Sequence, residues 1–166
     1  MSMKTNFDTV YVHYGSDTFN RAQVVISASD WNKVLIGKPN GLWASPVDAK
    51  GGWKDWCEGE EFHLDALDKH FKFKLKDTAR ILEVHNIEDI FRYVYEHRFG
   101  WELWYNGKST KVYLDNQALM EDFDGMELYL SENYKLRDQF FSAWDCDSIC
   151  IWNPDVIEVI KEEEKE

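Results

Sequence analysis

Three tryptophans lie close together between Gly41 and Cys57, in a segment that also carries glycine and proline. One belongs to Gly41-Leu42-Trp43-Ala44-Ser45-Pro46, and the other two to Gly51-Gly52-Trp53-Lys54-Asp55-Trp56-Cys57. A tryptophan ring is large and flat, and folded proteins keep it where it packs, stacks or donates a hydrogen bond. Rings carried by a turn rich in glycine and proline favour stacking on a flat ligand. A hydrophobic core or a partner-binding patch is the alternative.

Two further segments place polar side chains at the ends of expected strands. The first is Val12-His13-Tyr14-Gly15-Ser16, and the second is Asp147-Ser148-Ile149-Cys150-Ile151-Trp152-Asn153-Pro154. His13 and Asp147 are the candidate functional groups of these segments. Each also has a structural interpretation, because a lone histidine is common at a strand edge and aspartate is common where strands begin.

The composition predicts one folded domain over residues 1–160, followed by an acidic tail over 161–166. The chain has 166 residues, of which 44% are hydrophobic, so it can bury a core and is not a disordered chain. Acidic residues number 31 and basic residues 19, which gives a formal charge of −12. The negative electrostatic field of such a chain repels the phosphates of nucleic acids, so we expect no non-specific nucleic-acid binding. It suits a basic protein partner or serves solubility alone.

Several other classes of protein are disfavoured by what the sequence lacks. It has no apolar run long enough to span a membrane and no secretory signal at its start. Its three cysteines form no disulfide framework, which favours a reduced, cytoplasmic setting. The histidines lack partners at metal-ligand spacing, so we expect no metal site.

The elements that must position the candidate groups follow from periodicity and turn signals. Apolar residues at helical spacing predict helices over 53–62 and 87–97, with Asn86 as N-cap, and a short helix over 116–122. Asn106-Gly107 predicts a hairpin turn between 101–105 and 111–114. Residues 23–26 fit a strand or a short helix. Further strands are expected over 9–13, 71–75, 79–84, 126–130, 148–152 and 156–160. This mixture predicts an α+β domain with a largely antiparallel sheet.

In their order along the chain, the three segments resemble the signature strands of the ADP-ribosyltransferases, in the branch shared by diphtheria toxin and the poly(ADP-ribose) polymerases. The first family strand ends in His-Gly-Ser or His-Gly-Thr, whereas here Tyr14 separates His13 from Gly15. The second reads Gly-Ile-Tyr-Phe-Ala-Asp and leads into a helix with Tyr-Cys, where this chain has tryptophans. The third, Glu-Tyr-Ile-Val-Tyr-Asp, begins with the catalytic glutamate, where this chain has Asp147.

The resemblance implies a split, mostly antiparallel sheet with a few short helices that binds NAD as co-substrate, the nicotinamide lying between aromatic rings. It implies that His13 hydrogen-bonds the adenosine ribose and that the Gly15 backbone holds the nicotinamide amide, supported by Ser16. Asp147 would stabilise the oxocarbenium-like transition state, with His13 as the second catalytic residue. The implied cofactor-binding set is His13, Tyr14, Gly15, Ser16, Gly41, Trp43, Ser45, Trp53 and Trp56, with Trp43 and Trp56 in the stacking positions.

Departures from the family pattern leave two questions open at this level. The extra residue means that either His13 or Tyr14 faces the pocket, because a slip of one residue turns a side chain to the other face of a strand. Aspartate in place of glutamate shortens the reach of the carboxylate by one methylene, and the candidate substitutes elsewhere in the chain are Trp104, Asp122, Asp124 and Asp145.

By this resemblance we expect a mono-ADP-ribosyltransferase that uses NAD to modify a macromolecular acceptor, most simply a protein. The alternatives are a catalytically inactive acidic binding or inhibitor protein on the same fold, or an NAD glycohydrolase that uses water as acceptor. A small catalytic domain of this kind is, by analogy, expected of a phage or bacterial effector.

Overall fold

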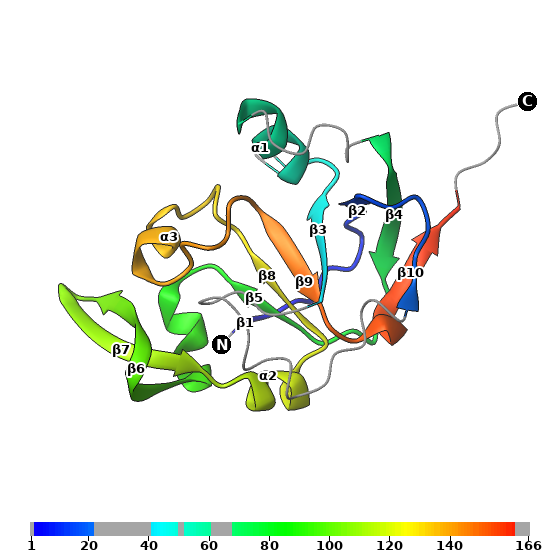
Figure 1. Ribbon diagram of the computed structural model, residues 1–166. Coiled ribbons are helices and arrows are strands. Elements are labelled where there is room, and N and C mark those ends of the chain that lie inside the picture. The colour runs from blue at the N-terminus through cyan, green and yellow to red at the C-terminus, as the bar shows by residue number, and fades with distance from the viewer. Residues whose placement is uncertain (1, 22–40, 50–51, 61–67, 162–166) are drawn as a thin grey trace, which may run out of the picture.

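A curled, eight-stranded sheet and a separate two-stranded hairpin make up most of the fold (Figure 1). The computed structural model describes residues 2–21, 41–49, 52–60 and 68–161. The strands of the larger sheet, in their order across it, are β1 (Ser2–Met3), β5 (Ile81–Val84), β8 (Gly125–Leu128), β9 (Ser148–Ile151), β3 (Leu42–Pro46), β2 (Tyr11–Tyr14), β4 (His70–Leu75) and β10 (Ile157–Ile160).

All neighbouring pairs among the described strands are antiparallel except β5 with β8. The α-helices are short: α1 (Trp53–Glu60), α2 (Asn116–Asp122) and α3 (Lys135–Gln139). Two 3₁₀ helices, η4 (Ile87–Tyr93) and η5 (Pro154–Val156), precede β6 (Val94–Tyr105) and β10. The predicted α+β class with a mostly antiparallel sheet is therefore confirmed. No helix within the described residues is long and apolar enough to cross a membrane.

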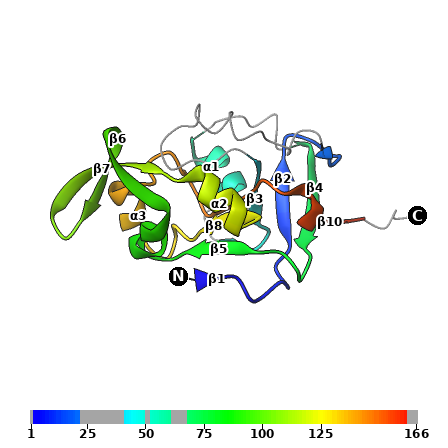
Figure 2. The ribbon, with the colours of Figure 1, turned by 90° about the horizontal axis from the view of Figure 1, so that it is seen from below.

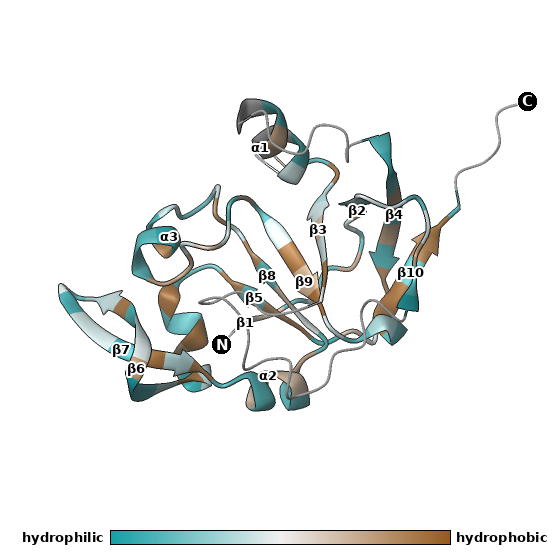
Figure 3. Cartoon of the chain, in the orientation of Figure 1, coloured by the Kyte–Doolittle hydropathy of each residue, from teal (hydrophilic) through white to brown (hydrophobic). Residues whose placement is uncertain are grey.

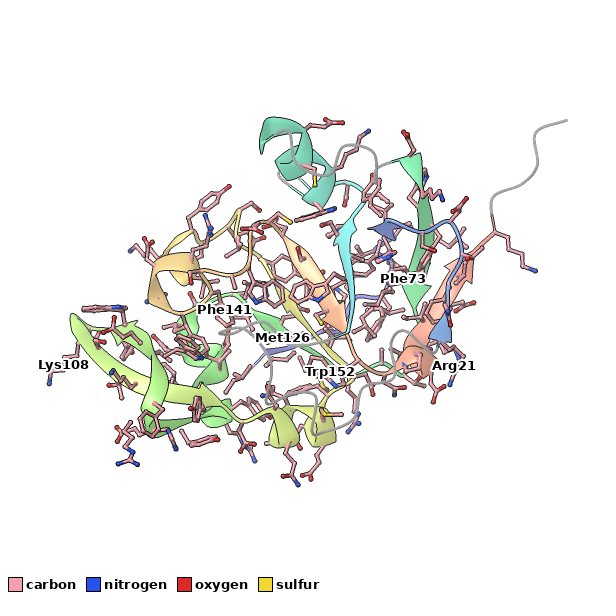
Figure 4. All side chains as sticks on the ribbon, viewed as in Figure 1. Arg21, Phe73, Lys108, Met126, Phe141 and Trp152 are labelled. Carbon is pink, nitrogen blue, oxygen red and sulfur yellow. The ribbon has the colours of Figure 1, made fainter. Side chains whose placement is uncertain are left out.

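Alternate residues of the central strands supply two hydrophobic clusters, because successive side chains of a strand point to opposite faces. On β9, Cys150 belongs to one cluster, whereas Ile149 and Ile151 belong to the other. All four residues of β9 are buried, and the strand is largely hydrophobic in Figure 3. The first cluster includes Met126, Phe141 and Trp152, and the second includes Phe73 on β4 (Figure 4).

The hairpin of β6 and β7 (Lys108–Leu114) forms at the predicted turn. Asn106 and Gly107 both have positive φ, 52° and 76°, as a two-residue turn of this kind requires. The hairpin projects from the body of the protein beside α3 and η4 (Figures 1 and 2), with Lys108 at its outer end (Figure 4).

The predicted helix over 87–97 is wrong in its second half. The chain forms η4 from Ile87 to Tyr93 and then enters β6 at Val94. Val94 pairs with Leu114, so the ladder of the hairpin takes over residues whose apolar spacing also fits a helix. Sheet pairing here overrides local periodicity.

Other predicted elements agree with the structure to within a few residues. The helix expected over 53–62 is described as α1, and the strand expected over 71–75 is β4. The helix over 116–122 is α2, whose N-cap Asp115 accepts a hydrogen bond from the Ala118 N–H. The prediction for residues 23–26 lies outside the described residues.

The feature that shapes the site is a split in the sheet between β2 and β3. Only Tyr11 and Val12 of β2 pair with β3, opposite Pro46 and Ser45. His13 and Tyr14 continue along β4, where their partners are Phe71 and His70. Beyond Val12 the two strands therefore separate, and their backbones no longer share a ladder.

Candidate functional site

A cavity of about 260 Å³ lies at this split. One wall comes from β2 and the other from β3 and the start of α1, while the segment that leads into β9 closes the remainder. The lining residues are Val12, His13, Tyr14, Trp43, Ala44, Ser45, Trp53, Ala143, Trp144, Asp145, Cys146 and Ser148. Five of the sequence-predicted site residues therefore meet in one place: His13, Tyr14, Trp43, Ser45 and Trp53.

His13 spans the split. Its Nδ1 lies 2.6 Å from the carbonyl oxygen of Trp43, and because a carbonyl only accepts, Nδ1 carries the hydrogen. Burial lowers the pKa of His13, and the bond to Trp43 opposes this only in part. The neutral ring accordingly keeps its lone pair on Nε2, where it can accept a hydrogen bond from a ligand hydroxyl.

Aromatic rings make up much of the cavity wall. Trp43 meets Trp144 edge to face, with ring centroids 4.5 Å apart and planes at 67°. Trp144 is almost fully buried and belongs to the first hydrophobic cluster, against which Trp43 also packs. Tyr14 and Trp53 add two more rings from β2 and α1. This lining favours a flat, aromatic part of a ligand, which edge-to-face and offset contacts stabilise beyond simple burial.

Ser45 joins three parts of the site. Its hydroxyl donates to the carbonyl oxygen of Asp147 at 2.7 Å and accepts a hydrogen bond from the Trp53 N–H at 3.0 Å. The first bond ties β3 to the entry of β9, and the second fixes the first residue of α1. Although Ser45 lines the cavity, its hydroxyl hydrogen is thus already donated to Asp147, and its oxygen already accepts from Trp53.

The two aspartates that flank Cys146 differ in where their carboxylates lie. Asp147 is 7% exposed, and its Oδ1 accepts a hydrogen bond of 2.7 Å from the Ser131 N–H while its Oδ2 accepts from the Ser131 hydroxyl. It is not among the cavity residues. Asp145 does line the cavity, with its side chain 29% exposed and its Oδ1 3.7 Å from Nη2 of Arg137. Asp145 is therefore the acidic residue of the cavity lining.

Strand alternation explains why Asp147 is turned away from Trp43, but not why Asp145 lines the cavity, because the two aspartates are two residues apart. Trp43 pairs with Cys150 across β3 and β9, so its side chain shares a face with Cys150 and with Ser148 two residues earlier. Asp147 and Ile149 alternate with these residues and belong to the other face. The catalytic role predicted for Asp147 stays a prediction, but its side chain is held at Ser131.

Three other predicted site residues lie outside the cavity lining. Gly15 has φ of 109° and donates its N–H to Lys69, so this amide is already paired along β4. The Ser16 hydroxyl donates to the carbonyl of Thr18 in a local turn. At Gly41 a Cβ would lie 2.8 Å from the carbonyl carbon of Ile151, so this glycine permits close packing of β3 on β9. The side chain of Trp56 lies outside the described residues.

Apart from Asp145, sequence reasoning missed the contribution of this segment to the cavity, which comes from Ala143, Trp144, Cys146 and Ser148. Cys146 and Ser148 add a thiol and a hydroxyl 3.2 Å apart. Burial raises the pKa of the Cys146 thiol above its ordinary value, so the thiol is neutral at physiological pH. The available signal was the position of this segment directly before β9, because residues that lead into a central strand lie at the same sheet edge as the ends of its antiparallel neighbours.

The described part of the chain contains no group of three or more histidine, cysteine, aspartate or glutamate side chains arranged to hold a metal ion. Comparisons with protein-family models, curated proteins and solved structures found no match to this chain.

Proposed function

We propose that this protein is a mono-ADP-ribosyltransferase that binds NAD at the split between β2 and β3 and modifies a protein acceptor. The observation that carries the proposal is the convergence of the three signature-like segments. Their strands, β9, β3 and β2, are consecutive neighbours in the sheet, and all three segments contribute to one cavity. Segments so far apart in sequence are not bound to lie together in the fold. That these three line one cavity supports a common role in binding a ligand.

The cavity suits the nicotinamide end of NAD. Its volume of about 260 Å³ is close to the lower end of ligand pockets, which hold about 300–1,000 Å³, so one end of a dinucleotide fits better than the whole. The nicotinamide ring stacks among Trp43, Trp53 and Tyr14, and the Nε2 of His13 accepts a hydrogen bond from a ribose hydroxyl. The remainder of NAD extends outward from the split.

The Asp145 carboxylate is the group best suited to promote the reaction. The glycosidic bond between C1′ of the ribose and the ring nitrogen breaks, and its electron pair leaves with neutral nicotinamide. Positive charge develops on the ribose, where a nearby carboxylate stabilises it. An acceptor nucleophile then bonds to C1′ and releases its proton. Asp145 lines the cavity and its side chain is partly exposed, whereas the Asp147 carboxylate is already held by two hydrogen bonds.

Incubation with etheno-NAD and cell lysate tests the proposal. We expect label transfer to protein, and we expect Asp145→Asn to reduce its rate by about a hundredfold, the scale of losing one group that stabilises transition-state charge. Asp155→Asn is the matched control, because Asp155 forms an exposed pair with Arg21 and does not line the cavity. Transfer that survives in Asp145→Asn, or that falls equally in both variants, contradicts the assignment.

Thermal unfolding with and without NAD separates binding from turnover. NAD at one hundred times its dissociation constant adds about 2.7 kcal/mol to the free energy of unfolding. Stabilisation without label transfer or nicotinamide release identifies a binding protein without turnover, an outcome favoured by the placement of Gly15 and Asp147 outside the cavity. Nicotinamide release without transfer identifies a glycohydrolase. No stabilisation by NAD refutes NAD binding.

A further inference from the structure

A second concave surface lies between the β6–β7 hairpin and α3, with a volume of about 520 Å³. We call it the hairpin groove. Helix α3 and strand β6 contact each other, and Figure 1 shows the hairpin beside α3 at one end of the protein. The groove is lined from the hairpin by Trp101, Glu102, Trp104 and Lys111, and from the α3 region mainly by Arg137 and Asp138.

Two tryptophans leave much of their surface exposed along this groove. Trp101 and Trp104 are each 45% exposed, although tryptophan side chains are usually well buried. Large exposed aromatic residues around a groove are typical of protein-binding surfaces, where tryptophan often dominates the affinity. The hairpin does not need these two rings for its own core, which Leu103 and Val112 supply.

The hairpin groove shares a wall with the cavity described above. Ser142 lines the groove, and the next three residues, Ala143 to Asp145, line the cavity. Arg137 lines the groove and also forms the ion pair with Asp145 at 3.7 Å. The segment 142–145 therefore runs from the groove to the cavity, so a polypeptide bound in the groove lies beside one wall of the cavity.

Charge identifies the kind of polypeptide that fits. The chain as a whole has a formal charge of −12, which attracts cationic partners over long range. Within the groove, Glu102 and Asp138 offer two carboxylates, and the Arg137 charge is already compensated by Asp145. Lys111 is the remaining cation and pairs across the hairpin with Glu102 in the strand register. The faces of Trp101 and Trp104 attract arginine or lysine side chains through cation–π contacts.

We propose that the hairpin groove docks an arginine- or lysine-rich segment of the acceptor protein, and so presents the acceptor to the neighbouring cavity. The role as an acceptor site rests on the proposed transferase function, but the binding itself does not. Cationic side chains lie over Trp101 and Trp104 and pair with Glu102 and Asp138. The acceptor is thus a basic protein, recognised at a surface separate from the cavity.

Binding of a fluorescent oligoarginine peptide, followed by anisotropy without NAD, tests this proposal. We expect the double variant Trp101→Ala/Trp104→Ala to bind about tenfold more weakly, as the loss of two ring–cation contacts predicts. Tyr134→Ala is the matched control, because Tyr134 is an exposed ring (66%) that does not line the groove. It should bind the peptide as the unaltered protein does.

A second double variant tests the groove without removing the tryptophan rings, in case the first double variant fails to fold. Glu102→Gln/Asp138→Asn keeps every aromatic contact, and we expect it to weaken binding several-fold, with the difference shrinking as salt is added. The proposal is overturned if the peptide does not bind, if all variants bind equally, or if oligoglutamate or oligothymidylate binds as tightly. Because NAD is absent, these outcomes are independent of label transfer and of NAD stabilisation, which test the function itself.

Discussion

Replacing Asp147 with alanine should lower the free energy of unfolding of the protein without changing the cavity lining directly. The variant removes a buried carboxylate that accepts two hydrogen bonds from Ser131, one from the N–H at 2.7 Å and one from the hydroxyl. It keeps the Asp147 carbonyl oxygen, to which the Ser45 hydroxyl donates, so the link between β3 and the entry to β9 survives.

The expected loss can be worked from these contacts. A hydrogen bond to an ionised acceptor stabilises by about 1.5–3 kcal/mol, so two of them set an upper limit of about 6 kcal/mol. Ser131 is exposed, however, and water replaces its lost partner once the carboxylate is gone. We therefore expect a loss of about 2–3 kcal/mol in the free energy of unfolding. For a chain of this length that lowers Tm by about 4–12 °C.

Two conservative variants sharpen the comparison. Asp147→Asn keeps one acceptor oxygen for the Ser131 N–H and should lose less than the alanine variant. Asp145→Asn removes only a partly exposed charge 3.7 Å from Arg137, so its cost in stability should stay below about 1 kcal/mol. Urea unfolding followed by tryptophan fluorescence measures all three. If Asp147→Ala unfolds like the unaltered protein yet abolishes label transfer, Asp147 acts on the substrate and our assignment of Asp145 is wrong.

Two further predictions concern other parts of the sheet. Gly41→Ala should destabilise the protein by about 1–3 kcal/mol in urea unfolding, because the added carbon collides with the Ile151 backbone; an unchanged midpoint contradicts this close packing. Burial opposes protonation of His85, but hydrogen bonds of 2.9 and 3.3 Å to Glu83 and Glu132 outweigh it and raise the His85 pKa. Protonated His85 then stabilises the fold fully below its unfolded pKa of about 6.5, and this stabilisation disappears as pH rises through the higher folded value. The difference in free energy of unfolding between the unaltered protein and His85→Gln should therefore shrink as pH rises through the folded pKa of His85. A difference that grows with pH contradicts these contacts.

Local signals predicted those elements whose form depends on few distant contacts. The Asn106-Gly107 turn fixes the hairpin because both residues adopt positive φ, and the alternation of residues 71–75 fixes β4 as a half-buried strand. The stretch after Tyr93 illustrates the limit. Its apolar spacing fits a helix, but Val94 gains a partner in Leu114, twenty residues away, and extends the sheet instead. A partner at that distance leaves no trace in the local periodicity.

The candidate site divides in a similar way. Sequence motifs located the ends of β2 and β3, and with them His13, Trp43 and Ser45, because these residues lie on the strands themselves. They did not reveal which acid before β9 faces the cavity. Strand alternation cannot make that choice, because Asp145 and Asp147 are two residues apart and both precede β9. The two side chains instead differ in their distant contacts, since Asp147 is bound by Ser131 and Asp145 pairs with Arg137, and the segment alone does not determine these.

The extra residue between His13 and Gly15 has a structural consequence for the proposed chemistry. Tyr14 pairs with His70, so β2 keeps to β4 for one residue more before Gly15 turns away with φ of 109°. The N–H of Gly15 is then bound to Lys69, and the glycine lies outside the cavity. A ligand amide in this cavity consequently meets the edge of β2 at His13 and Tyr14, both of which line it. If NAD binds here, its nicotinamide is held by the rings of the cavity wall and by His13, without help from the glycine.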